Sequence, residues 1–111
     1  MSFHASAQDI RVEENHILRA TIPNNDGEMV EAELDLNNCI GNNNGSFQWE
    51  GQGFTDSGDN FSFNFEGDGI PVLRGELQNV EGEACSCDIN IAERISNQNG
   101  QLVFRKPRSF P

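Results

Sequence analysis

The chain contains one segment twice. Residues 17–49, ILRATIPNNDGEMVEAELDLNNCIGNNNGSFQW, align without a gap to residues 72–104, VLRGELQNVEGEACSCDINIAERISNQNGQLVF, at a constant offset of 55. Toward the N-terminus the match continues at an offset of 51, which pairs Ser6 with Ser57. The second copy therefore carries a four-residue insertion, which we place in the glycine-rich stretch 66–71. A site built by one copy can accordingly be present twice.

The length of the chain indicates that the two copies share one core. A chain of 111 residues fits a single compact domain. Each copy, of roughly 50 residues, is close to the lower size limit for independent folding. We therefore predict a single domain over residues 1–104, with repeats at about 2–52 and 53–104. Residues 105–111, RKPRSFP, hold two prolines and a basic cluster, and they are predicted to form a disordered tail.

The charge of the chain narrows the classes of partner. Asp and Glu number 18 against 7 Lys and Arg, which gives a net charge of −11. Such a surface repels phosphate backbones and anionic lipids, so neither nucleic acid nor membrane is expected as a partner. The start, MSFHASAQD, has no apolar run long enough for a signal peptide, and the three cysteines do not repeat between the copies. We expect a cytoplasmic protein without disulfides.

Apolar residues mostly alternate with polar ones, which indicates short, half-buried strands. The alternating sets are Ile10 and Val12, Leu34 and Leu36, Phe47 and Trp49, Phe61, Phe63 and Phe65, Ile89 and Ile91, and Leu102 and Phe104. Asn44-Gly45 and Asn99-Gly100 lie between such runs and are typical of type I′ hairpin turns. Before each hairpin the alternation breaks for about one helical turn, and Asn90 is suited to cap the second. The pattern predicts an all-β fold.

A polar motif, Asn-x-Asn-Gly, recurs at 42–45 and 97–100, and Asn24 and Asn79 recur in a turn. An Asn side chain carries two donors and an acceptor, so a cluster of them can bind the adjacent hydroxyls of a neutral sugar. The alternative is that Asn serves the fold, through left-handed backbone and side-chain-to-backbone turns. That alternative explains the second Asn of each motif, beside glycine. A hairpin turn does not require the first Asn, which favours a binding role there.

Several other residues could bind a ligand or a metal ion, but a structural role explains them better. Trp49 could stack on a sugar ring, but its counterpart is Phe104 in an alternating strand, which favours a place in the core. Cys85 and Cys87 lack the further ligands of a zinc site, and we expect buried strand thiols. A calcium loop at Asp56, Asp59, Glu66 and Asp68 does not match the spacing of known loops. We identify no catalytic residues, no metal site and no cofactor, and an enzyme is not expected.

These motifs together resemble the cyanovirin-N homology lectins. Residues 34–54, LDLNNCIGNNNGSFQWEGQGF, resemble the first repeat of that family, and residues 89–104, INIAERISNQNGQLVF, resemble the second. The resemblance implies a pseudo-twofold all-β fold with strand exchange, comprising two triple-stranded sheets, two β-hairpins and short helical turns. It also implies a lectin for α(1→2)-linked mannose of high-mannose glycans. A monomer is expected, with a strand-swapped dimer as the alternative state.

The resemblance implies two carbohydrate-binding pockets. The first comprises Gly41, Asn42, Asn43, Asn44, Gln52, Gly53, Asp56, Ser57, Gln78, Asn79 and Val80. The second comprises Ser2, Ala5, Ser6, Pro23, Asn24, Asn25, Asn97, Gln98 and Asn99. The first is the better equipped, because Asp56 can accept a charge-assisted hydrogen bond and its counterpart Ala5 cannot. The rival function is an acidic protein-interaction domain that keeps its repeats only for folding.

The chain differs from the bacterial relatives at the positions of their two disulfides. Ala7 and Ile22 occupy one of these neighbourhoods and Gly58 and Leu77 the other, so neither bridge can form. The resemblance thus implies a disulfide-free, fungal-type member. Each missing bridge forgoes about 2 to 4 kcal/mol of stability. We expect Ile22 and Leu77 to offset part of this loss by packing.

Overall fold

The computed structural model describes residues 6–67 and 69–105, most of them in short strands and 3-10 turns. The elements of the first repeat are β1 (Gln8–Glu13), β2 (Ile17–Pro23), β3 (Met29–Asp35), η2 (Leu36–Asn38), β4 (Ile40–Asn43) and β5 (Ser46–Trp49). Those of the second are η3 (Phe54–Ser57), β6 (Gly58–Glu66), β7 (Ile70–Gln78), β8 (Ala84–Asn90), η4 (Ile91–Glu93), β9 (Ile95–Gln98) and β10 (Gln101–Phe104). Within these described residues, no helix is long and apolar enough to cross a membrane.

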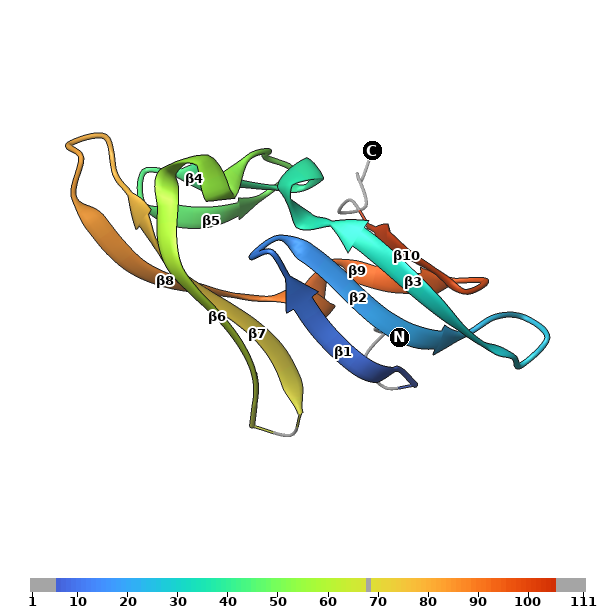
Figure 1. Ribbon diagram of the computed structural model, residues 1–111. Helices are drawn as coiled ribbons and strands as arrows, with labels where there is room; N and C mark the ends of the chain where they lie inside the picture. Colours follow the sequence, from blue (N-terminus) through green and yellow to red (C-terminus); the bar gives the residue numbers. More distant parts are fainter. Residues whose placement is uncertain (1–5, 68, 106–111) are drawn as a thin grey trace, which may run out of the picture.

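The strands form two antiparallel three-stranded sheets and two hairpins. One sheet has the order β1-β2-β3 and the other β6-β7-β8, while β4-β5 and β9-β10 pair only within their hairpins. The two sheets lie toward opposite ends of an elongated molecule (Figure 1), with principal extents of 50 × 37 × 24 Å. The all-β, pseudo-twofold architecture predicted from the repeat is confirmed.

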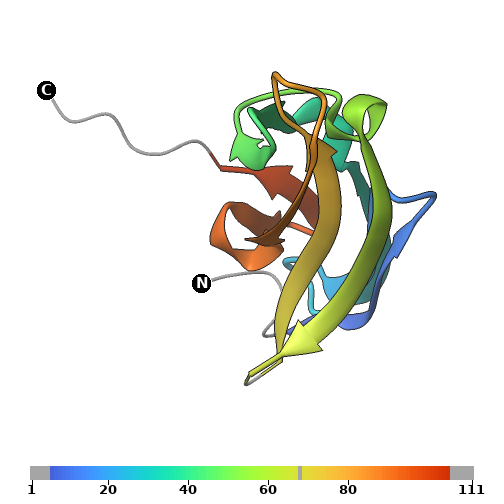
Figure 2. The same ribbon diagram turned by 90° about the vertical axis from the view of Figure 1, so that its left-hand side faces the viewer.

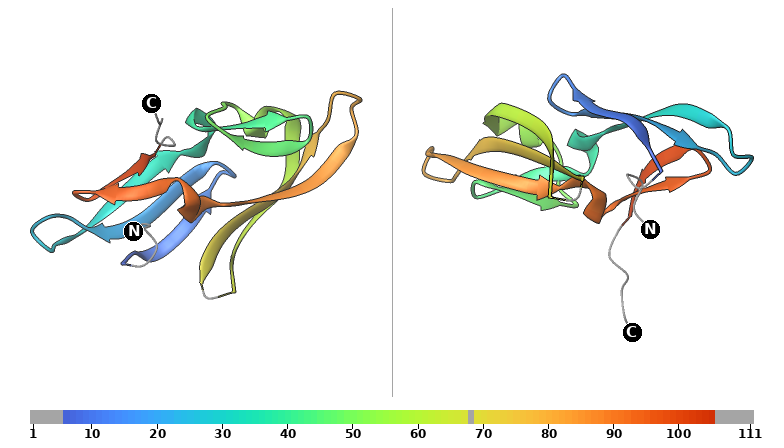
Figure 3. Two further views of the ribbon diagram at one scale, coloured as in Figure 1. Left: turned by 180° about the vertical axis from the view of Figure 1, so that it is seen from behind. Right: turned by 90° about the horizontal axis from the view of Figure 1, so that it is seen from below.

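Each hairpin packs against the sheet of the other repeat. Figure 3 shows β4-β5 beside β8 and β9-β10 beside β3 from two directions. The contacts are close, because a Cβ on Gly45 would lie 2.9 Å from Cys85 Sγ, and a Cβ on Gly100 would lie 2.7 Å from Val30 Cγ2. Each structural half therefore contains strands from both repeats, which confirms the expected strand exchange.

Local chemistry sets the turns that the sequence predicts. Asn44 and Gly45 have φ of 50° and 89°, and Asn99 and Gly100 have φ of 49° and 83°. Positive φ at both central residues is the requirement of a type I′ turn, which Asn and Gly meet at least cost. The predicted helical turns are η2 and η4. Asn90 caps η4 by accepting a hydrogen bond from Ala92 N, and Asp35 caps η2 in the same way from Asn37 N.

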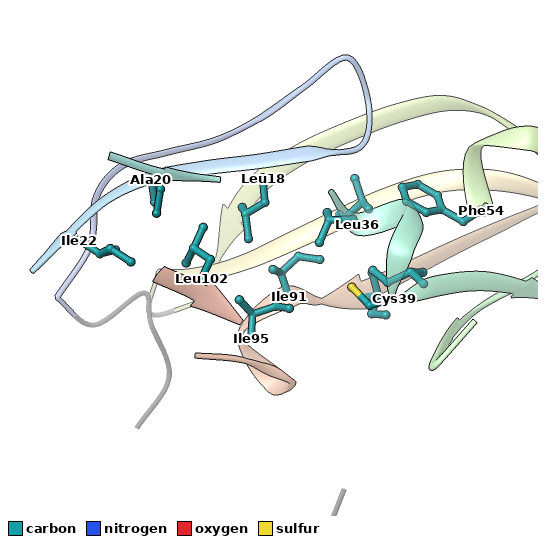
Figure 4. Packing of buried hydrophobic residues seen from close by; sticks show 13 residues of the cluster. Leu18, Ala20, Ile22, Leu36, Cys39, Phe54, Ile91, Ile95 and Leu102 are labelled. Carbon is teal, nitrogen blue, oxygen red and sulfur yellow. The ribbon is translucent and has the colours of Figure 1, made fainter. Parts of the chain in front are cut away.

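One apolar cluster joins the two repeats. Figure 4 shows Leu18 and Leu36 of the first repeat directed toward Ile91, Ile95 and Leu102 of the second. All five of these side chains are buried. Trp49 packs against this cluster and stacks on Phe104, its counterpart in the repeat, with ring centroids 5.6 Å apart and planes at 18°. The two copies therefore share their core, as the length of the chain predicts.

The positions of the missing disulfides are closed by apolar side chains. Ile22 and Leu77 are both fully buried, as expected. Gly58 lies opposite Leu77, and a Cβ added to Gly58 would lie 2.5 Å from Leu77 Cδ2. Glycine at position 58 therefore leaves the space that the Leu77 side chain fills.

All three cysteines are free thiols. Cys39 is buried, but Cys85 and Cys87 are only half-buried on β8, so the prediction of buried strand thiols was wrong for those two.

The four-residue insertion lengthens one hairpin. The β1-β2 pairing ends at Glu13 opposite Ile17, whereas β6-β7 continues through Phe65 opposite Pro71 and Glu66 opposite Ile70. Phe65 lies on this extension and is 51% exposed. The alternation of Phe61, Phe63 and Phe65 predicts that all three lie on the buried face of a strand, which is wrong for Phe65, because the extra pairs extend beyond the part of the hairpin that packs on the core. Phe61 and Phe63 do pack against it.

The predicted disordered tail, 105–111, is only partly described. Arg105 belongs to the described residues, and its backbone N donates a hydrogen bond to Arg94 O at 2.6 Å. Arg105 is the only residue of the predicted tail among the described residues, and disorder of the tail stays a prediction. Residues 106–111 lie outside the described residues.

We expect the stability of the fold to fall at alkaline pH because of Cys39. Burial, followed by the negative charge of Asp35, raises the pKa of the Cys39 thiol from 9.0 to about 11. The stability contributed by the neutral thiol is thus complete below pH 9 and is lost as the pH rises through about 11. Chemical denaturation across this range should show a loss of about 2 to 3 kcal/mol.

The control is Cys39→Ala, which removes the titrating group but keeps Cys87, whose thiol pKa is also raised by burial. The variant should be less stable at neutral pH and should lose less stability between pH 9 and 11. Parallel curves for the two proteins would show that ionisation of Cys39 does not govern the alkaline loss.

Candidate functional site

The Asn42 side chain joins three segments of the chain. It projects from β4, and its Nδ2 donates hydrogen bonds to Ser57 Oγ at 2.7 Å and to the main-chain O of Gln78 at 2.8 Å. Its Oδ1 accepts a hydrogen bond from Gly45 N at 2.8 Å. Both amide hydrogens and the carbonyl oxygen are therefore engaged within the protein. The result is a fixed junction between the β4-β5 hairpin, the end of η3 and the end of β7.

Two further asparagines fix the neighbouring turn between β7 and β8. Asn44 Oδ1 accepts a hydrogen bond from Val80 N at 3.0 Å. Asn79 Oδ1 accepts from Glu81 N at 2.9 Å and from Glu83 N at 3.0 Å, which closes the turn on itself. The tip of the first hairpin is thus tied to a turn of the second repeat.

Most of these bonds recur at the other junction. Asn97 Nδ2 donates to Pro23 O at 2.8 Å, and its Oδ1 accepts from Gly100 N at 2.9 Å. Asn99 Oδ1 accepts from Asn25 N at 2.9 Å. Asn24 Oδ1 accepts from Asp26 N and Glu28 N within its own turn. Each residue that bonds to an asparagine here corresponds, at the offset of 55, to a residue that bonds to the equivalent asparagine at the first junction.

These contacts give the first Asn of each motif a structural role. The sequence favoured binding of sugar hydroxyls by Asn42 and Asn97, but in the structure their amides hold the exchanged hairpins to the opposite sheets. The physical reason is the strand exchange. It brings main-chain carbonyls of one repeat against the hairpin of the other, and such groups require partners when they leave water. The structural interpretation of the motif thus accounts for these side-chain bonds, and a direct contact of either asparagine with sugar stays a prediction.

Three predicted site residues line a polar cavity beside the first junction. The cavity has a volume of about 310 Å³ and is lined by Asp56, Ser57, Gly58, Asp59, Glu76, Gln78 and Ala84. Asp56 and Gln78 are exposed, and Ser57 is half-buried. The cavity lies between η3, the start of β6 and the end of β7. It therefore depends on the junction that Asn42 holds.

Glycines shape the loop that carries two more predicted residues, Gln52 and Gly53. A Cβ on Gly51 would lie 2.7 Å from Gly41 Cα, so this approach of two backbones requires glycine at both positions. Gly53 has φ of 71°, in the left-handed region, and directs the chain into η3. Gln52 is exposed and lines a separate cavity of about 470 Å³ with Asn38, Glu50, Gly51 and Phe104.

Sequence reasoning missed four residues that line the 310 Å³ cavity, namely Gly58, Asp59, Glu76 and Ala84. Asp59 and Glu76 lie opposite each other in the β6-β7 ladder. The alternation along β7 would have indicated Glu76, because residues two apart on a strand share one face and Gln78 was already predicted. Asn43, also predicted, is exposed at the end of β4 and has Ser46 as its cross-strand partner.

The second predicted pocket is described only in part. Ser2 and Ala5 lie outside the described residues. Pro23, Asn24, Asn25, Asn97 and Asn99 do come together, through the hydrogen bonds of the second junction and the approach of Gly100 to Asn24. Ser6 and Gln98 are exposed.

The structure also bears on the stacking role considered for Trp49 and on the metal sites considered from the sequence. Trp49 Nε1 donates to Glu93 Oε1 at 3.2 Å while its ring stacks on Phe104, which places it at the contact between the repeats. Within residues 6–67 and 69–105, no group of three or more His, Cys, Asp or Glu side chains is arranged to hold a metal ion. Asp68, one of the four carboxylates considered for calcium, lies outside the described residues.

Comparison with known proteins agrees with this geometry. The CVNH domain family model matches residues 3–103. A cyanovirin-N homolog of Neurospora crassa is 39% identical over 107 residues, covering 92% of this chain and 96% of the relative. The NMR structure of the Gibberella zeae CVNH protein superposes with a TM-score of 0.89 at 44% identity, covering 94% of this chain and 97% of the other. Microvirin in complex with mannobiose superposes with a TM-score of 0.82 at 30% identity, covering 93% and 97%. The resemblance seen in the sequence is confirmed, and the chain belongs to the CVNH domain family.

Proposed function

We propose that this protein is a lectin that binds α(1→2)-linked mannose disaccharide units of high-mannose glycans, through the cavity lined by Asp56, Ser57 and Gln78. Membership of a lectin family supports carbohydrate binding and a role other than catalysis. Microvirin, a relative with the same fold, forms a complex with mannobiose, which supports mannose as the sugar. The observation that carries the proposal is the polar cavity beside the Asn42 junction.

The cavity presents the mixture of donors and acceptors that a sugar requires. Asp56 is an acceptor, and a hydrogen bond from a sugar hydroxyl to its carboxylate is charge-assisted. Ser57 Oγ already accepts a hydrogen bond from Asn42 Nδ2, so its own O–H is directed elsewhere and can donate to a sugar oxygen. Gln78 adds an exposed amide with both functions. Adjacent sugar hydroxyls both donate and accept, which this set matches.

In this proposal the asparagines position the site. Asn42 holds Ser57 and the main chain of Gln78 through one amide nitrogen, so the spacing of two lining residues depends on it. Asn44 holds Val80 at the rim in the same manner. Preorganisation of this kind reduces the ordering cost that a weak, polar site has to meet on binding.

The test is an NMR titration with α(1→2)-mannobiose. A shallow polar site of this type binds with a dissociation constant of roughly 1 mM, equivalent to about −4 kcal/mol. Saturating shifts should appear at Asp56, Ser57 and Gln78 and at the Asn42 to Asn44 hairpin. A flat response at millimolar sugar would contradict the proposal and favour the acidic protein-interaction domain.

Two substitutions separate binding from positioning. Asp56→Asn removes a charge from an exposed side chain and should weaken mannobiose binding about tenfold, with an unchanged free energy of unfolding.

Asn42→Ala leaves the Gln78 carbonyl without its partner and should lower the free energy of unfolding by about 1 to 3 kcal/mol. Urea denaturation and the titration together measure both effects.

The matched control is Asn97→Ala, which removes the equivalent amide at the other junction. It should lower stability by a similar amount while leaving the shifts at Asp56 and Ser57 intact. Equal stability of Asn42→Ala and the unmodified protein would show that the Asn42 amide is not a structural element.

A further inference from the structure

The outer faces of the two sheets differ although the repeats are related. On the β1-β2-β3 sheet, two arginines and three glutamates form one continuous network. Arg11 Nε lies 2.9 Å from Glu13 Oε2, Arg19 Nη2 lies 2.8 Å from Glu33 Oε2, and Glu31 Oε1 lies 3.7 Å from both guanidinium groups. These long side chains cover the face.

On the β6-β7-β8 sheet, two of the five positions carry serine. The counterpart of Arg11, at the offset of 51, is Ser62, and the counterpart of Glu31, at the offset of 55, is Ser86. Arg74, the counterpart of Arg19, is retained. Its Nε donates to Glu66 Oε2 at 2.7 Å, and its Nη1 donates to Asp88 Oδ2 at 2.9 Å. Ser86, whose side chain is shorter than that of glutamate, lines a hollow on this face.

The hollow is a groove, which we name the β7-β8 groove. It has a volume of about 390 Å³ and is lined by Asn60, Arg74, Gly75, Glu76, Ser86, Cys87 and Asp88. The sheet that carries it faces the viewer in Figure 2. Hydrogen bonds and ion pairs fix the side chains that line the groove. Asn60 Nδ2 donates to Glu76 Oε1 at 2.8 Å, and the Arg74 guanidinium lies between the carboxylates of Glu66 and Asp88.

The groove adjoins the proposed mannose cavity. Glu76 lines both the β7-β8 groove and the cavity that contains Asp56, Ser57 and Gln78. Arg74, Glu76 and Gln78 share one face of β7, because side chains two residues apart on a strand point the same way. At about 3.4 Å per residue, Arg74 lies roughly 14 Å from Gln78 along the strand. A disaccharide at Gln78 would therefore leave the far part of the groove free.

We propose that the β7-β8 groove is an extension subsite for the further sugar units of a linear, neutral oligosaccharide whose end occupies the Asp56 cavity; this inference rests on the proposed function. The guanidinium of Arg74 supplies donors, Glu76 and Asp88 supply acceptors, and the Ser86 hydroxyl supplies both. Three carboxylates near one arginine disfavour phosphorylated or acidic sugars. The equivalent face of the first sheet is covered by Glu31 and its arginines.

The test compares α(1→2)-mannobiose with α(1→2)-mannotetraose by isothermal titration calorimetry and NMR. In the unmodified protein, tetraose should bind more tightly and shift Arg74, Ser86 and Asp88 in addition to the cavity residues. Ser86→Glu restores the side chain that fills the first sheet, and Arg74→Ala removes the donors. Each should weaken tetraose binding about tenfold, or about 1.4 kcal/mol, and leave mannobiose binding unchanged.

The matched control is Arg19→Ala, which removes the arginine at the equivalent position of the other sheet and should affect neither sugar. If mannobiose binds while Ser86→Glu and Arg74→Ala bind tetraose as well as the unmodified protein does, the extension subsite is wrong and the mannose cavity stands. A variant that weakens both sugars equally, or an equal loss in Arg19→Ala, also overturns it. Absence of binding by both sugars overturns this inference together with the proposed function.

Discussion

Each repeat buries its apolar residues only by exchanging a hairpin with the other, and the exchange depends on one asparagine in each hairpin. Asn42 and Asn97 donate to main-chain carbonyls at the ends of β7 and β2, in the opposite repeat. Without these bonds the carbonyls at the junction would lose water and gain no partner. The amides therefore allow two copies of about 50 residues to form one core of a size that neither reaches alone.

The position of the candidate site is a consequence of this exchange. The Asp56 cavity is bounded by η3, β6 and β7, and the asparagine that orders it comes from the β4-β5 hairpin. The same amide that secures the fold also fixes Ser57 with its hydroxyl hydrogen free to donate. Stability and site geometry are thus coupled through one side chain, while exposed Asp56 makes no comparable contribution to the fold.

The two repeats differ mainly at positions that neither the junctions nor the shared core require. The asparagines, the turn glycines and the inward apolar residues recur, because the junctions and the shared core need them in both copies. The outward residues have changed. Ser62 and Ser86 replace Arg11 and Glu31, and Asp56 replaces Ala5. One half has a hollow outer face beside its cavity, while the other has its outer face covered by an ion-pair network.

Much of the fold was accessible from the amino-acid sequence because it depends on short-range chemistry. The type I′ turns at Asn44-Gly45 and Asn99-Gly100, the cap at Asn90 and the alternating strands are all set by neighbouring residues. The predicted burial of Ile22 and Leu77 is confirmed, since an apolar side chain on the inner face of a strand packs inward in any related fold. Phe65 shows the limit, because local alternation does not reveal that two inserted cross-strand pairs extend a hairpin beyond the core.

By itself, the sequence determined the duplication, the all-β class, the turn positions and the family, because repetition, periodicity and Asn-Gly pairs are properties of the linear chain. Only the tertiary structure decided what the asparagine amides do and which carboxylates and amides form a cavity. Asn42 has the same donors whether it binds a sugar or a carbonyl, and the choice between them depends on which segment 36 residues away in the chain lies within hydrogen-bond distance.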